Sequence, residues 1–205
     1  MQVNKDRSTG HEDAAVPPAL HGRNTRACAV AYTGVFGWAV TAGHRYRRGG
    51  GCTCADTSCG WPGAHPEREP VAALPAHRVG EVFDGRPGAG VICDCALFDA
   101  VILPYESGLL VMEELERVAV RAPCMVGDHT TATILALPGT GLAMAGMCAE
   151  VRSGTGDWIA LPPTKNLRWD TPPTHPLDLP DAAVIRAALE AALGRVRPSA
   201  DHGLP

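Results

Sequence analysis

One short segment, residues 50–66, constrains the fold of this chain more than any other. It holds three cysteines and one histidine, which are Cys52, Cys54, Cys59 and His65. Four sulfur and nitrogen ligands able to close into a tetrahedron are what a structural Zn²⁺ ion requires. The segment is rich in glycine and proline and has few apolar residues, so we expect bound zinc to be the source of its order. The alternative is a loop of unliganded, reactive thiols.

The remaining cysteines have different surroundings. Protein side chains fill all four ligand positions of the predicted zinc site, so a structural ion is expected rather than a catalytic one. Cys93 and Cys95 form a second pair that offers metal ligands, but their apolar, strand-like context favours buried free thiols. We interpret Cys28, Cys124 and Cys148 as core fillers or incidental surface residues.

Composition excludes several classes of protein. Of the 205 residues, 45% are hydrophobic and 20% are charged, which is typical of a globular chain and not of a disordered one. A net charge of −4 gives no protein-wide basic field, so any nucleic-acid contact must come from a local patch. Residues 1–25 lack an apolar export signal, and neither uncharged run, 27–43 or 130–149, is suited to span a membrane. We therefore expect a cytoplasmic protein with no membrane contact and no disulfides.

The pattern of apolar runs and turn residues predicts an α+β domain of about five strands, with helices to one side of the sheet. The domain is expected over residues 18–197, between flexible tails at 1–17 and 198–205. Helices are predicted at 19–36, within 71–83, at 105–118 and after Asp181. Strands are predicted at 38–42, 88–95, 97–103, 131–137 and 157–161, with residues 43–70 and 164–180 as loop and linker.

Several short motifs, taken together with the cysteine-rich loop, resemble a known family. They are AVAY at 29–32, GWAV at 37–40, PGAGV at 87–91, FDAVILP at 98–104 and GDWIALPP at 156–163. In this order, across about residues 27–195, they resemble the N-terminal prim-pol domain of actinobacterial bifunctional DNA primase/polymerases. The resemblance implies a fold related to archaeo-eukaryotic primases, with a mixed, RRM-like sheet, flanking helices and an inserted zinc loop. It also implies nucleotidyl transfer with two divalent metals.

The sequence departs from the family at the catalytic positions. The central strand of catalytic members ends in an acid-x-acid pair, whereas the matching positions here hold Ile102 and Pro104, which cannot bind Mg²⁺. No Ser-x-His motif occurs. We therefore expect a degenerate member, a pseudoenzyme without catalytic residues. The alternative is an active primase/polymerase that uses Mg²⁺ or Mn²⁺ through displaced acids such as Asp94 and Asp99.

A basic segment directly precedes the zinc loop. It consists of Arg45, Tyr46, Arg47 and Arg48, in which arginines can contact phosphates and the tyrosine can stack on a base. The alternative is a solvated basic loop. The expected partner is single-stranded nucleic acid or a protein, and Trp61 is the aromatic residue most expected to face a partner. A third hypothesis is a zinc or thiol protein-interaction module that binds no nucleic acid. Any priming role would require a helicase in trans.

Overall fold

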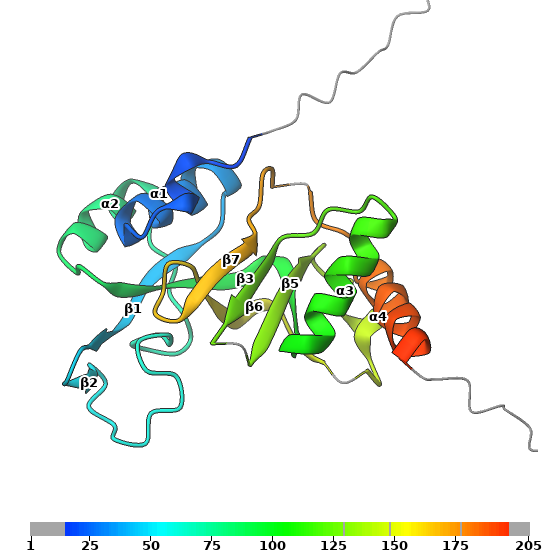
Figure 1. Cartoon of the computed structure of the whole chain (residues 1–205). Coiled ribbons are helices and arrows are strands. Elements are labelled where there is room, and N and C mark those ends of the chain that lie inside the picture. The colour runs from blue at the N-terminus through cyan, green and yellow to red at the C-terminus, as the bar shows by residue number, and fades with distance from the viewer. Residues whose placement is uncertain (1–14, 129, 148, 177, 197–205) are drawn as a thin grey trace, which may run out of the picture.

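The computed structural model describes residues 15–128, 130–147, 149–176 and 178–196 (Figure 1). Most of both expected tails, and Cys148, therefore lie outside the described residues. The helical elements are η1 Pro18–His21, α1 Thr25–Phe36, α2 Ala76–Asp84, α3 Tyr105–Arg117, η2 Gly141–Met144 and α4 Ala182–Val196. The strands are β1 Val40–Arg47, β2 Gly51–Cys52, β3 Ala89–Pro104, β4 Cys124–Gly127, β5 Thr131–Ala136, β6 Glu150–Leu161 and β7 Leu167–Thr171. None of these helices is long and apolar enough to cross a membrane.

The strands form a seven-stranded sheet in the order β2-β1-β3-β5-β4-β7, and β6 pairs with β3 off this path. The six pairings in the described part of the chain are all antiparallel, so the mixed sheet implied by the family resemblance is not seen there. Strand β3 is central, because β6 follows it along one edge while β1 and β5 share the other. The α+β class is confirmed.

Helices cover both faces of the sheet, so the prediction that they lie to one side is wrong. Helices α1 and α2 pack with Val91, Cys93 and Ala100 in one core, whereas α3 and α4 pack with Val101 and Leu103 in another. A strand buried on both faces is apolar at nearly every position, as residues 89–103 largely are. The predicted strands at 88–95 and 97–103 are one strand, interrupted by register shifts between Asp94 and Ala100.

Local sequence signals predict where the helices begin and end better than they predict which helix residues are buried. Helix α1 ends at Gly37, whose φ of +68° is the left-handed conformation that glycine adopts most easily. Asp181 accepts a hydrogen bond from the Ala183 N–H at 2.8 Å and so caps α4 as predicted. Helix α4 continues through Gly194, although glycine more often lies just past the end of a helix. On α1, the apolar residues Val30 and Val35 are exposed although they share helical spacing with the buried Ala31.

The strands that sequence analysis missed are short, polar or alternating. Strand β4 was not predicted, β7 lies in the expected linker, and β6 begins seven residues before the predicted 157–161. Strand β1 also runs on to Arg47, through residues that were expected to form a loop. Burial is only partly present in β1, β6 and β7, so their sequences lack a clear strand pattern. Strand β4 is fully buried but has only four residues.

Candidate metal centre and basic hairpin

The four predicted zinc ligands come together in the structure. The ligand atoms of Cys52, Cys54, Cys59 and His65 all lie within 4.8 Å of one another. The Sγ atoms of Cys52 and Cys59 lie 3.3 and 3.4 Å from Nε2 of His65. In the described part of the chain this is the one group of three or more His, Cys, Asp or Glu residues that converges in this way. A Cys₃His set of this kind fits Zn²⁺.

Contacts outside the four ligands orient them toward a common point. Nδ1 of His65 lies 3.1 Å from the carbonyl oxygen of Pro66, which leaves Nε2 directed at the thiols. The Gly63 N–H donates to Sγ of Cys52 at 3.3 Å. Such contacts fix the ring and satisfy the sulfur of a metal-bound thiolate. The loop therefore holds both the ligands and the groups that position them.

The electrostatics of the thiols show what a cation would contribute. Partial burial opposes ionisation of Cys52, but hydrogen bonds from the Cys54 and Gly63 backbones and from His65 lower its pKa to about 6. Desolvation, with the adjacent Cys52 and Cys54 side chains, raises the pKa of Cys59 to about 11. One thiolate thus disfavours its neighbour when no cation is present. A divalent metal removes that repulsion, since it binds thiolates and releases their protons.

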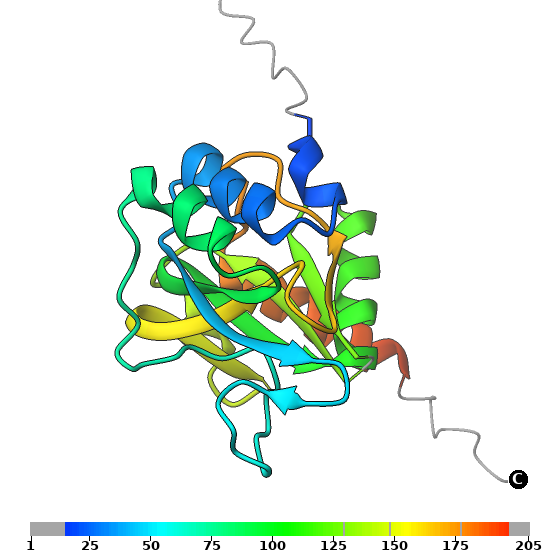
Figure 2. The same ribbon diagram turned by 90° about the vertical axis from the view of Figure 1, so that its left-hand side faces the viewer.

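The zinc loop, residues 50–66, packs on the sheet face opposite α1 and α2 (Figure 2). A Cβ atom on Gly43 would lie 2.5 Å from the His65 carbonyl oxygen, and one on Gly90 would lie 2.5 Å from that of Gly63. The His44 N–H also donates to the His65 carbonyl oxygen at 3.0 Å. Only glycine allows the loop backbone this close to β1 and β3, so the sheet is shaped to receive the loop.

A catalytic zinc is less compatible with the surroundings of the cluster. His65-Pro66-Glu67 fits the His-x-Glu pattern that zinc deaminases use to place a general acid/base, and the sequence analysis overlooked this match. The Glu67 carboxylate, however, is paired with Arg86 at 2.7 Å. Protein side chains also supply all four ligands, which leaves no position for water or substrate. The arrangement favours a structural site.

The acids considered for two-metal chemistry are engaged elsewhere. Asp99 is fully buried, and its Oδ2 accepts a hydrogen bond from the Gly141 N–H at 2.6 Å. Its Oδ1 accepts one from the Ser153 hydroxyl at 2.5 Å. Asp94 accepts from the Ala96 N–H at 2.7 Å. These contacts assign both carboxylates to loop and strand architecture, and neither belongs to a converging group of three or more possible metal ligands in the described part of the chain.

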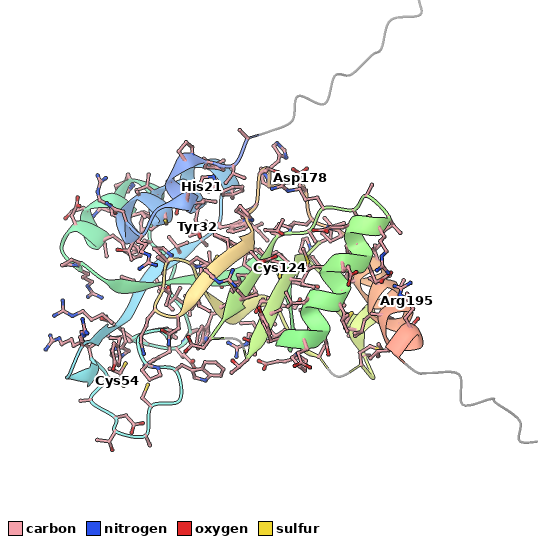
Figure 3. All side chains as sticks on the ribbon, in the orientation of Figure 1. His21, Tyr32, Cys54, Cys124, Asp178 and Arg195 are labelled. Atoms are coloured by element: carbon pink, nitrogen blue, oxygen red, sulfur yellow. The ribbon has the colours of Figure 1, made fainter. Side chains whose placement is uncertain are left out.

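The predicted basic residues lie on the hairpin formed by β1 and β2. Tyr46 is 40% exposed, Arg47 and Arg48 are exposed, and Arg45 is half-buried. No described carboxylate lies within ion-pair distance of these three arginines, although eight other arginines of the described chain form such pairs. Figure 3 shows nitrogen-bearing side chains extending from this hairpin near the labelled Cys54. The hairpin therefore carries uncompensated positive charge.

Sequence reasoning missed one member of this surface. Nζ of Lys165, from the turn between β6 and β7, lies 3.6 Å from the centre of the Tyr46 ring. This cation–π contact adds a positive charge beside the hairpin. Lys165 lies in the segment expected to be a linker. It is far from Tyr46 in the sequence, so no local pattern indicates their contact.

Comparisons of the chain with protein-family models, with curated proteins and with solved structures found no match. The candidate metal centre and the basic hairpin are therefore identified by their geometry alone.

Proposed function

We propose that this protein is a zinc-stabilised, prim-pol-like pseudoenzyme that binds single-stranded nucleic acid without catalysing nucleotidyl transfer. The observation that carries the proposal is the β1–β2 hairpin, where three arginines without acidic partners flank an exposed tyrosine. Arginines contact phosphates, and an aromatic ring stacks on any unpaired base. The overall charge of −4 makes this local concentration of cations more distinctive.

The zinc loop supports the hairpin mechanically. The Arg45 N–H donates to the Thr53 hydroxyl at 3.0 Å, and the Thr53 N–H donates to the Arg45 carbonyl oxygen at 3.0 Å. Thr53 lies between the ligands Cys52 and Cys54, so a metal that fixes these cysteines also fixes the backbone of Arg45. In this proposal zinc supplies order to the binding surface and takes no part in a reaction.

The proposal excludes catalysis because the carboxylates needed for two-metal transfer are missing or engaged elsewhere. Two-metal transfer requires carboxylates that share both ions. Ile102 and Pro104 occupy the positions that resemble the catalytic pair, and Asp99 is held by Gly141 and Ser153 inside the fold. We expect no nucleotide incorporation on a primed single-stranded template with Mg²⁺ or Mn²⁺. Product that depends on metal and disappears in Asp94→Asn or Asp99→Asn would establish the active alternative instead.

The binding test uses fluorescence anisotropy of a labelled oligothymidylate of about 16 nucleotides, titrated at several salt concentrations. Phosphate contacts make the affinity fall steeply with salt. We expect the double variant Arg47→Ala/Arg48→Ala to bind more weakly and with a shallower salt dependence. The matched control is Arg26→Ala/Arg78→Ala, which removes two exposed arginines that are paired with Asp84 and Glu81.

Two outcomes would contradict the proposal. One is wild-type protein, loaded with zinc, that shows no salt-dependent binding to the oligothymidylate. The other is equal weakening in the hairpin and control variants, since that would show a general charge effect. The first outcome would favour a zinc-dependent protein-interaction module, for which Trp61, 59% exposed on the zinc loop, is the contact residue.

A further inference from the structure

A pocket lies next to the hairpin and shares one residue, Lys165, with the surface described so far. The pocket has a volume of about 750 Å³ and opens between the η1–α1 connection and β7. Its lining includes Arg23 on one side and Lys165, Arg168 and Trp169 on the other. Lys165 is the lysine that contacts Tyr46 of the hairpin at 3.6 Å. The pocket and the hairpin are therefore contiguous through one side chain.

The charges of the pocket leave a positive excess. Arg23 has no ion-pair partner among the described residues, and Lys165 contacts an aromatic ring rather than a carboxylate. Arg168 lies 3.9 Å from Asp170, which also lines the pocket. The other lining carboxylate, Asp128, accepts a hydrogen bond from the Asn166 amide. The lining therefore holds three cations and two carboxylates, a net charge of +1, and Arg23 and Lys165 are the two cations without a carboxylate partner.

An aromatic ring at the same place is held in a fixed position. Nε1 of Trp169 donates to the Tyr32 hydroxyl at 2.7 Å, and that hydroxyl donates to the Pro162 carbonyl oxygen at 2.6 Å. The Trp169 ring also meets the Tyr32 ring edge-on. Trp169 is half-buried, so part of the indole remains toward the pocket. A pre-positioned aromatic surface beside free cations is suited to a base with its phosphate.

We propose that this pocket binds a nucleotide of the same single strand that contacts the hairpin, with Lys165 at the junction of the two positions. The inference rests on the proposed nucleic-acid binding and extends it. Arg23 and Lys165 contact the backbone phosphates, and the indole of Trp169 stacks on the base. The strand follows the zinc-supported hairpin and then enters the pocket beside β7.

The test compares Arg23→Ala with Arg26→Ala in zinc-loaded protein. Arg26 lies three residues further on, in the first turn of α1, is paired with Asp84 at 2.9 Å and does not line the pocket. With the oligothymidylate of about 16 nucleotides, we expect Arg23→Ala to make the salt slope shallower by about 0.7, the contribution of one single-strand phosphate contact. Arg26→Ala is expected to keep the wild-type slope, and Trp169→Phe, which retains a ring, is expected to bind more weakly while folding normally.

A footprint gives an independent measurement. Lys165 and Lys5 are the two lysines of the sequence, so acetylation by an amine-selective reagent reports on Lys165 with Lys5 as the reference. Bound oligothymidylate is expected to reduce acetylation of Lys165 relative to Lys5. The pocket inference is overturned, with the proposed function intact, if the hairpin variant loses affinity while Arg23→Ala keeps the wild-type slope. Unchanged acetylation of Lys165 in the complex overturns it as well. If the wild-type protein does not bind the oligothymidylate at all, both the pocket inference and the proposed function are contradicted.

Discussion

The cysteines of the zinc loop and the cysteines of the sheet are the same residue type in opposite surroundings. Cys52, Cys54 and Cys59 converge on an imidazole in a loop with few apolar neighbours. Cys95 and Cys124 are fully buried among the apolar side chains of the two cores. The loop group offers a metal its ligands, whereas the sheet thiols fill space.

The proton affinities of the two groups follow from these surroundings. Hydrogen bonds outweigh partial burial at Cys52 and lower its pKa to about 6. Burial raises the pKa of both Cys95 and Cys124 to about 12. A thiol that ionises readily binds metal, and one that stays protonated behaves as a small hydrophobic group. Within the loop group Cys52 ionises readily, whereas Cys59, with a pKa of about 11, needs a cation to do so. We therefore expect a bound metal to order the loop, while burial orders the sheet.

The largest expected effect is loss of zinc, which should follow substitution of a loop cysteine but not of a sheet cysteine. Cys52→Ser is expected to remove stoichiometric zinc and to expose the zinc loop, because apparent binding free energies of structural zinc reach about 10–16 kcal/mol. Cys124→Ala is expected to retain the zinc. Metal analysis and amide hydrogen exchange of residues 50–66 measure the two outcomes. Stoichiometric zinc in Cys52→Ser would show that the cysteine is not a ligand.

The sequence predicted the convergence of the four possible metal ligands, because the information for it is local. Four ligands within one short segment, separated by glycine and proline, specify which side chains must converge. The same analysis favoured a buried free thiol at Cys93, which is fully buried. For Cys124 it left core and surface open, and the structure buries the residue. It missed the contact of Lys165 with Tyr46, since nothing in the local sequence of either residue indicates the other. The pocket beside β7 was missed for the same reason.

The sequence predicted the α+β class correctly, but not the placement of the helices or the full set of strands. Helix ends at Gly37 and Asp181 depend on local backbone chemistry and were found where expected. The faces of α1 and the strands β4 and β7 depend on neighbours that are distant in the sequence. Strand β7 is a polar edge segment, which becomes a strand only because the sheet supplies its hydrogen-bond partners. Strand β4 is fully buried but only four residues long, too short to show a strand pattern of its own.

A substitution in the core between α3, α4 and the sheet should lower stability without changing zinc content, the opposite pattern to Cys52→Ser. Leu115 is fully buried in α3, and Leu115→Ala is expected to lower the free energy of unfolding by about 2–5 kcal/mol while zinc content stays unchanged. Leu109, exposed on the same helix, gives the control, for which we expect a change of about 0.5 kcal/mol. Urea unfolding measures both. Loss of zinc in Leu115→Ala would mean that the loop and the core are not independent.

The buried thiols also predict how stability depends on pH. The pKa of Cys124 rises from an ordinary 9.0 to about 12 in the folded chain, through desolvation. Above pH 9 the unfolded chain loses a proton that the folded chain keeps. Unfolding therefore releases a proton, and each such thiol lowers stability by up to about 1.4 kcal/mol per pH unit. We expect Cys124→Ala to show a correspondingly shallower loss of stability above pH 9, and an unchanged slope would contradict the burial effect.

The smallest expected effect concerns the aromatic residue of the zinc loop. Trp61 is 59% exposed, so it contributes little burial to a segment that has few apolar residues. If ligands rather than side-chain packing order the loop, Trp61→Ala should change the unfolding free energy by no more than about 0.5 kcal/mol and leave the zinc content unchanged. Urea unfolding and metal analysis of the variant measure these values. Loss of zinc or of loop protection in Trp61→Ala would show that packing shares in ordering the loop, and the contrast with the sheet would then be one of degree.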